Sequence, residues 1–189
     1  NHRRDNWGGD LDHRMNFMRL CIDEVMKAAA GEIAVVVKTN MRDGFKSGND
    51  LPEGIAMAQE LERLGVDALV LSGGFVSKAP MYVMRGSMPI QTMTHYMDCW
   101  WLKYGVRYGG GQLMIKNEPY KDLYFLDDAL EVRRNVKLPL IYVGGCVSRS
   151  GIEQVLHSGF HAVQMARALV NEPDFVNRMA QGEERCGCD

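Results

Sequence analysis

Residues 138–173 read LPLIYVGGCVSRSGIEQVLHSGFHAVQMARALVNEP, and the rest of the chain is organised around this stretch. Its two short apolar runs, residues 138–143 and 162–165, are typical of buried strands. Between them, Ser150 and Glu153 have the spacing of a capping box, which predicts that a helix begins here. A strand, a helix and a second strand form a βαβ unit, which places two parallel strands in one sheet.

Both predicted strands end in residues that suit an anion. Gly144 and Gly145 follow the first strand, and glycine lets a ligand approach the main chain closely. Ala166 and Arg167 follow the second strand, and a guanidinium can bind phosphate through two hydrogen bonds. The phosphate site of a (β/α)8 barrel is commonly built from the loops after its last two strands. The sequence therefore predicts a phosphorylated cofactor at this edge.

The chain upstream alternates helix and strand. A helix capped by Asp10 is expected over residues 11–30. It is followed by a strand at 33–39 that reads as buried on both faces, a helix capped by Asp50, and a strand at 67–71. The apolar face of the first helix is predicted to consist of Phe17, Leu20, Cys21, Val25 and Ala28.

Residues 75–137 are less regular. Helices are expected at 92–103 and 123–135, with a glycine break at 109–111 between them. Four bulky side chains at near-helical spacing predict a core or an interface: Tyr96, Met97, Trp100 and Trp101.

Four strands with helices between them fit half of a (β/α)8 barrel. A complete barrel has eight strands, and a phosphate-type pair would be its last two. Residues 1–189 are therefore expected to be a partial barrel, strands five to eight, of a longer protein. The alternative is a complete flavodoxin-like open sheet, which places its phosphate loop after the first strand.

Composition excludes several function classes. The chain has 189 residues, a net charge of -2, 46% hydrophobic and 24% charged residues, which is a soluble globular profile. No basic stripe suggests nucleic acid, and no apolar run is long enough to span a bilayer. Five scattered cysteines favour reduced thiols in the cytoplasm over a disulfide framework. The histidines lack metal-ligand spacing, so no metal site is predicted.

Several segments resemble a known family. NHRRDNWGG at residues 1–9 is similar to the N-x-R-x-D-x-(Tyr)-G-G segment of the Old Yellow Enzyme family of NADH:flavin oxidoreductases, with Trp7 in place of the tyrosine. VVVKTN, LVLSGG, LIYVGG and MARALVNEP resemble, in the same order, strands five to eight of that family.

The resemblance implies a barrel that holds FMN at its C-terminal face. Gly144, Gly145, Ala166 and Arg167 would bind the FMN phosphate, with Ala166 in place of the usual glycine. Lys38 would stand where most of the family has an arginine beside the flavin N1/O2 edge. The family's catalytic His with His or Asn, and its proton-donating tyrosine, precede the N-x-R-x-D segment, so no catalytic residue is assigned.

Residues 183–189 look like the start of a cysteine-containing tail with Cys186 and Cys188. In longer relatives similar to dienoyl-CoA reductases, cysteines just after the barrel hold an iron–sulfur cluster. The usual spacing is wider than the single residue that separates these two. Two free thiols are therefore the expectation, with the cluster left open.

The expected function is that of an FMN-dependent oxidoreductase, in which hydride passes from NAD(P)H through FMN to an activated alkene or similar small-molecule acceptor. Two alternatives stay open. Lys38 could form a Schiff base in an aldolase-type barrel, or the chain could be a non-catalytic phosphate-binding fragment. The sequence does not decide the acceptor, the choice between NADH and NADPH, or the oligomeric state, for which a homo-oligomer is one option.

Overall fold

The structure, a computed structural model, describes residues 3–86, 89–109 and 118–188. Four strands in these residues form one parallel sheet in the order β1-β2-β3-β4. Their bounds are β1 Val36–Asn40, β2 Ala68–Ser72, β3 Leu140–Val143 and β4 Ala162–Gln164. In the wall of a (β/α)8 barrel, each strand lies beside the next strand in the sequence, as here. In a flavodoxin-like sheet the strand order instead reverses at a switch point. The chain is a partial (β/α)8 barrel, as expected.

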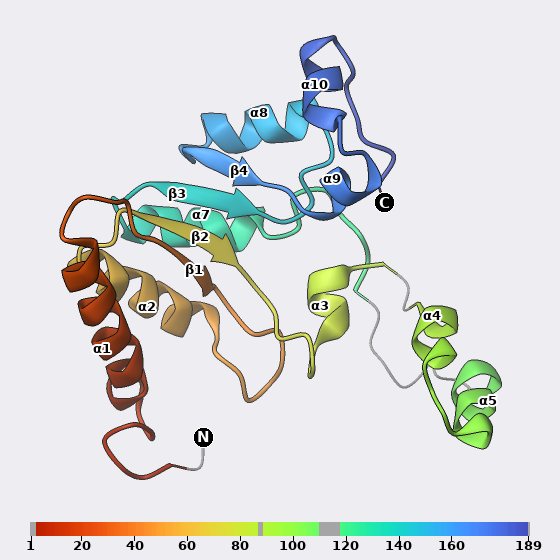
Figure 1. Ribbon diagram of the computed structural model, residues 1–189, viewed down its shortest axis with the longest axis horizontal. Coiled ribbons are helices and arrows are strands. Elements are labelled where there is room, and N and C mark those ends of the chain that lie inside the picture. Colours follow the sequence, from red (N-terminus) through yellow and green to blue (C-terminus); the bar gives the residue numbers. More distant parts are fainter. Residues whose placement is uncertain (1–2, 87–88, 110–117, 189) are drawn as a thin grey trace.

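α2 (Leu51–Arg63), α7 (Leu126–Asn135) and α8 (Arg149–His157) connect these strands and pack against the sheet (Figure 1). α2 packs against β1 and α7, and α7 packs against β3. The described helices are α1 Leu11–Ala29, α2 Leu51–Arg63, α3 Pro80–Met84, α4 Ile90–His95, α5 Trp100–Tyr108, α7 Leu126–Asn135, α8 Arg149–His157, α9 Arg167–Asn171 and α10 Phe175–Ala180.

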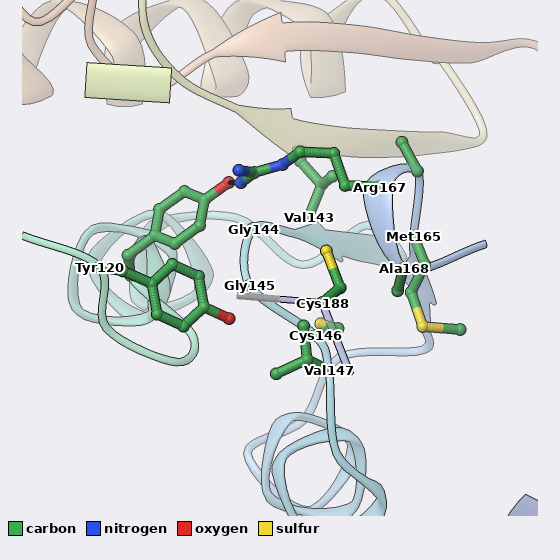
Figure 2. Close-up of a pocket in the computed structure, with 12 residues that line it drawn as sticks. Tyr120, Val143, Gly144, Gly145, Cys146, Val147, Met165, Arg167, Ala168 and Cys188 are labelled. Carbon is green, nitrogen blue, oxygen red and sulfur yellow. Dashed lines mark hydrogen bonds between the residues drawn. The ribbon is translucent and has the colours of Figure 1, made fainter. Parts of the chain in front are cut away.

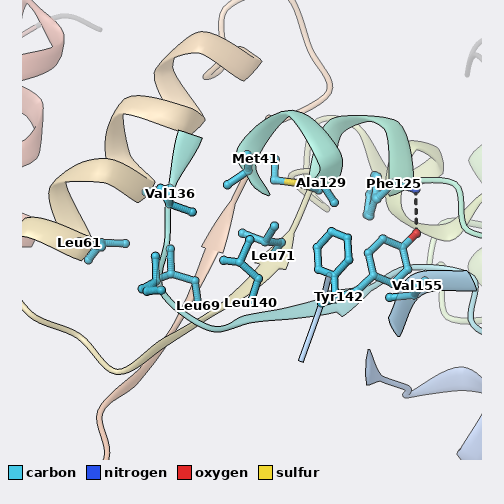
Figure 3. Packing of buried hydrophobic residues seen from close by; sticks show 14 of the residues in the cluster. Met41, Leu61, Leu69, Leu71, Phe125, Ala129, Val136, Leu140, Tyr142 and Val155 are labelled. Atoms are coloured by element: carbon cyan, nitrogen blue, oxygen red, sulfur yellow. Dashed lines mark hydrogen bonds between the residues drawn. The ribbon is translucent and has the colours of Figure 1, made fainter. Parts of the chain in front are cut away.

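The core lies between the sheet and this helical layer (Figure 3). Alternate residues of a strand point to the same face, so one face of β2 and β3 supplies a continuous apolar layer. The side chains of that layer are fully buried: Leu69, Leu71, Leu140 and Tyr142. They pack against helix residues that are equally buried, namely Ala58, Leu61, Ala129 and Val132.

The other face of the sheet is open at its two outer strands. Val36 of β1 is 49% exposed, and Lys38 of β1 and Gln164 of β4 are exposed as well. This is the face that points into the interior of a complete barrel. The expectation of a strand at 33–39 buried on both faces is therefore wrong, because β1 is an edge strand that begins only at Val36.

Local capping signals were mostly correct. Asp10 accepts a hydrogen bond from the His13 N–H at 2.9 Å, and Asp50 accepts one from the Glu53 N–H at 3.1 Å. Ser150, however, does not cap α8. Ser148 has the extended backbone of an N-cap, and its hydroxyl accepts from the Gly151 N–H at 3.2 Å, which places Ser150 inside the first turn.

The predicted inward face of α1 is wrong. Phe17 is 69% exposed and Leu20 is 53% exposed. The residues of α1 that contact the core are Met18, Ile22, Met26 and Ala29. α1 carries two apolar stripes, and its packing against α2 at the edge of the sheet decides which of them is buried.

Residues 75–137 also differ from expectation. The helix predicted at 92–103 is interrupted and forms α4 and α5, which pack on each other outside the main body (Figure 1). α7 begins at Leu126 because Leu123 has a positive φ of 53°, which a helix cannot contain. The part of the glycine break at 110–111 lies outside the described residues. Tyr96 and Trp100 do not contribute to the core, since Tyr96 is 81% exposed and Trp100 is 72% exposed, and an interface at these residues stays a prediction.

No helix among the described residues combines the length and apolarity that crossing a bilayer requires.

Candidate functional site

A pocket of about 80 Å³ lies at the carboxyl ends of β3 and β4 (Figure 2). Gly144 and Gly145 line it after β3, and Ala166 and Arg167 line it after β4. Parallel strands end at the same edge of a sheet, so two neighbouring strands bring these four residues together. The four residues of the expected phosphate site therefore share one pocket.

The Gly144–Gly145 turn requires glycine at both positions. Their φ angles are 131° and 71°, which side chains rarely permit. A Cβ on Gly144 would lie 2.8 Å from Phe125 Cδ2, and one on Gly145 would lie 2.8 Å from the Leu123 nitrogen. Among the described residues, neither glycine N–H donates a backbone hydrogen bond. The turn thus has two main-chain donors that an anion can use.

Ala166 precedes α9 with φ -122°. This φ is negative, so the position does not require glycine, and the alanine keeps its N–H. Alanine in place of the family's glycine is therefore compatible with the turn between β4 and α9.

Arg167 begins α9, and its exposed side chain is held by two contacts. Its Nη1 donates to the Met84 carbonyl at 2.5 Å, and its Nη2 donates to the Tyr124 hydroxyl at 3.1 Å. Both partners come from the irregular part of the chain between β2 and β3. These contacts hold the guanidinium at the pocket, where its exposed N–H groups can bind an anion.

Tyr120 and Tyr124 also line the pocket, and the sequence analysis did not identify them. The Tyr120 hydroxyl is buried, and the Asp122 carboxylate lies close enough to interact with it. Burial, with a further contribution from the Asp122 charge, raises the pKa of Tyr120 to about 12. Tyr120 is therefore a neutral hydroxyl donor at physiological pH. No sequence signal marked these residues, since they follow the irregular segment.

Cys146 and Cys188 line the same pocket from two distant parts of the chain. Burial raises the pKa of the Cys146 thiol to about 12, and the Asp122 charge contributes further. Because the thiolate is the reactive form, Cys146 is a poor nucleophile. The position of Cys146 directly after the glycine pair could have identified it from sequence.

The C-terminal tail reaches the pocket by pairing with the loop after β3. The Cys186 N–H donates to the Val147 carbonyl at 2.8 Å, and Arg185 Nη1 lies 2.6 Å from Asp122 Oδ2. Cys186 is buried, and all five cysteines, each within the described ranges, are free thiols. Over residues 3–86, 89–109 and 118–188, no cluster of three or more His, Cys, Asp or Glu could hold a metal ion.

Lys38 does not line this pocket. It is exposed near the middle of β1, and its register partner in β2 is Val70, which in turn pairs with Ile141 of β3. Lys38 therefore lies on the open face of the sheet, two strands away from the glycine turn. Its role beside a flavin stays a prediction.

The amino-terminal segment forms a compact loop before α1. Asp5 pairs with Arg3 at 2.6 Å and accepts from the Trp7 N–H at 3.1 Å. A Cβ on Gly8 would lie 2.2 Å from Arg3 Cβ, so the close turn requires this glycine. Asn1, the first residue of the resembling segment, lies outside the described residues.

Comparisons with known proteins identify relatives of this chain. The model of the NADH:flavin oxidoreductase / NADH oxidase family matches residues 1–105. The 4,4'-dithiodibutanoate disulfide reductase of Rhodococcus erythropolis is 35% identical over 179 residues, which cover 94% of this chain and 44% of that protein. The chain thus spans less than half the length of this curated relative.

Solved structures share the fold. A complex of 2-naphthoyl-CoA reductase has a TM-score of 0.70 at 16% identity, over 97% of this chain and 23% of that chain. An old yellow enzyme homologue from Zymomonas mobilis has a TM-score of 0.59 at 17% identity, over 98% of this chain and 42% of that chain.

Proposed function

Since this chain belongs to the NADH:flavin oxidoreductase / NADH oxidase family, we propose that it supplies the FMN phosphate site of an FMN-dependent oxidoreductase. FMN, with NAD(P)H as reductant, is the cofactor of this family. The observation that carries the proposal is the pocket in which the Gly144–Gly145 turn meets Arg167. The activity of the whole protein is part of the proposal, because this chain corresponds to 44% of the disulfide reductase.

The residues present fit a phosphate group. The N–H groups of Gly144 and Gly145 and the guanidinium of Arg167 are hydrogen-bond donors, and the guanidinium adds positive charge. The buried hydroxyl of Tyr120 lies at the same pocket. Charge-assisted hydrogen bonds to an anion are about twice as strong as neutral ones, so Arg167 would contribute most.

Lys38 is proposed to serve as a fixed cation at the flavin edge. It lies on the face that points into a complete barrel, where its amine is exposed and free to approach a bound ring. A cation at this position would stabilise negative charge on a reduced flavin and so tune its electronics. Lysine keeps the charge of the family's arginine but lacks its two-pronged geometry.

When bound, FMN would accept hydride from NAD(P)H and reduce a second substrate. The residues of this chain would hold the phosphate, orient the ring through it and supply the Lys38 charge. We propose an activated alkene as the acceptor, which gains a hydride and a proton. A second candidate is an organic disulfide, whose reduction consumes one hydride and one proton and yields two thiols. The 35% identity to the 4,4'-dithiodibutanoate disulfide reductase supports the second candidate.

The first test is the visible absorption spectrum of the purified protein, expressed with any sequence that flanks this chain. A flavin band that NAD(P)H bleaches, and that is released as FMN on denaturation, is the expected result. Reoxidation is then followed with an activated alkene and with 4,4'-dithiodibutanoate, and the faster acceptor identifies the substrate class.

Two results would contradict the proposal. A colourless protein that takes up no added FMN would remove the flavin assignment and leave a phosphate-binding fragment. Unchanged FMN affinity in Arg167→Ala would remove Arg167 from the site. The Schiff-base alternative predicts that borohydride traps a phosphorylated carbonyl compound on Lys38, whereas the flavin proposal predicts no trapping.

A further inference from the structure

Arg85 has a backbone conformation that almost only glycine adopts. It follows α3 with φ 58° and ψ 164°. The next residue, Gly86, has φ 79° and is a glycine, as this region favours. A residue with a side chain stays in such a conformation only when surrounding contacts hold it there. The contacts of the Arg85 side chain therefore hold its backbone in this conformation.

Three aromatic rings surround the Arg85 guanidinium. Its central carbon lies 4.8 Å from the ring centroid of Tyr82, 4.9 Å from that of Tyr124 and 5.5 Å from that of Phe125. Glu118 lies 3.7 Å from Nη1, and the side chain is only 12% exposed. A cation in such a cage is attracted to the faces of the rings, more strongly when water is excluded. The cage thus fixes both the arginine and the rings.

Two of these rings form the floor under the glycine turn. A Cβ on Gly144 would lie 2.8 Å from Phe125 Cδ2, and one on Gly145 would lie 2.9 Å from Tyr124 Cδ1. The rings and the turn are therefore in direct contact. Any shift of the rings would move the N–H groups of the turn.

The same segment also holds Arg167. The carbonyl of Met84, the residue before Arg85, accepts from Arg167 Nη1 at 2.5 Å. The hydroxyl of Tyr124, whose ring lies under the Arg85 guanidinium, accepts from Arg167 Nη2 at 3.1 Å. The same hydroxyl lies 3.3 Å from the Val83 carbonyl, to which it donates. Both contacts of the pocket arginine thus come from groups that Arg85 positions.

We propose that Arg85 is a positioning residue for phosphate recognition. Its strained backbone sets the direction of the Met84 carbonyl, and its guanidinium clamps Tyr124 and Phe125 against the glycine turn. Arg85 does not line the pocket itself, so it acts through Arg167 and the turn. The inference rests on the proposed function, in which Arg167 binds the phosphate of FMN.

The test compares FMN with riboflavin, which has the same ring and no phosphate. The protein, with any flanking sequence, is titrated with both flavins by fluorescence, and the ratio of the two affinities is measured. The variants are Arg85→Met, which keeps the length of the side chain, and Arg85→Gly, which suits the backbone conformation. Arg107→Met is the matched control, because Arg107 also lies over an aromatic ring, that of Tyr108 at 5.8 Å, but on α5.

We expect both Arg85 variants to lower the ratio by about tenfold, the effect of weakening one charge-assisted hydrogen bond. Riboflavin affinity should not change, and the control should behave as the wild type. A purely structural role would lower both affinities together and leave the ratio unchanged. If Arg85→Met does not fold, Arg85→Gly, which relieves the backbone strain, decides the question.

An unchanged ratio in Arg85→Gly, with a lowered ratio in Arg167→Ala, would overturn this inference and leave the proposed function intact. A wild-type protein that binds FMN and riboflavin equally well would overturn both, because no phosphate contact would then exist.

Discussion

Tyr142 donates a hydrogen bond of 2.7 Å from its buried hydroxyl to the carbonyl of Gly144. The same hydroxyl accepts from the Phe125 N–H at 3.2 Å. One side chain of β3 thus ties the glycine turn to the segment that carries the aromatic rings. Because Tyr142 is fully buried, no water can replace either bond.

Removing this hydroxyl should destabilise the protein. Tyr142→Phe leaves two buried backbone groups without partners, and we expect the free energy of unfolding to fall by about 2–4 kcal/mol. The measurement is urea denaturation. Tyr108→Phe is the control, because Tyr108 is 74% exposed and its change should stay within about 0.5 kcal/mol. Equal effects of the two substitutions would show that the Tyr142 bonds contribute nothing.

Gly145→Ala should be far more harmful than Gly31→Ala. Both glycines have a positive φ, 71° and 77°, so both substitutions strain the backbone by about 1–3 kcal/mol. A Cβ on Gly31 meets nothing within 4 Å, whereas one on Gly145 lies 2.8 Å from the Leu123 nitrogen. We expect Gly145→Ala to cost about 2 kcal/mol more in unfolding free energy, from the displaced backbone. Comparable losses for the two variants would mean that the turn is not closely packed.

Glu60 should make stability depend on pH in the acid range. Hydrogen bonds from Arg63 and Arg19 lower the pKa of Glu60 from 4.5 to about 2. A carboxyl with a lowered folded-state pKa stabilises the protein above the unfolded pKa. This stabilisation is lost as the pH falls from 4.5 towards about 2.

The expected contribution of Glu60 is about 1–2 kcal/mol after allowance for solvent screening. Glu60→Gln should flatten the decline of unfolding free energy over this pH range, as measured by urea titration at successive pH values. Glu131→Gln is the control, since the Glu131 pair with Arg134 is exposed on both sides. A decline that persists unchanged in Glu60→Gln would exclude this ion pair as its cause.

Cys146 should resist alkylation in the folded protein. Burial raises its pKa to about 12, so almost no thiolate is present at about pH 8. Cys21 is exposed and should be modified first by iodoacetamide, as peptide mass spectrometry would record. Unfolding in urea should make both react alike. Modification of native Cys146 at the rate of Cys21 would contradict its buried state.

Most features that depend on neighbouring residues in sequence were predictable, although the cap of α8 is Ser148 and not Ser150. The caps at Asp10 and Asp50 need only a side chain and an N–H three residues later, and both occur as expected. The sequence also predicted that Gly144 and Arg167 line one pocket. Both follow parallel strands of a βαβ unit, and the carboxyl ends of such strands lie at the same edge of the sheet.

Features that depend on tertiary packing were not predictable. The packing of α2, which is remote in sequence, decides which apolar stripe of α1 is buried. The prediction that Phe17 faces the core was therefore wrong, and Met18 packs there instead. Tyr124 and Arg85 come from the irregular segment, where no periodicity indicates which side chains turn towards the pocket. The strain at Arg85 is visible only in its backbone angles.

The sequential strand order has a consequence for synthesis. β1 and β2 can pair soon after both have left the ribosome. The second edge of β2 pairs with β3, which begins only at Leu140. Translation at about 5–20 residues per second needs roughly 3–13 s to produce residues 73–139, which lie between them. During this interval the edge of β2 is unpaired, and such edges promote aggregation. Yield of this protein should therefore depend on chaperones and on translation speed within that segment.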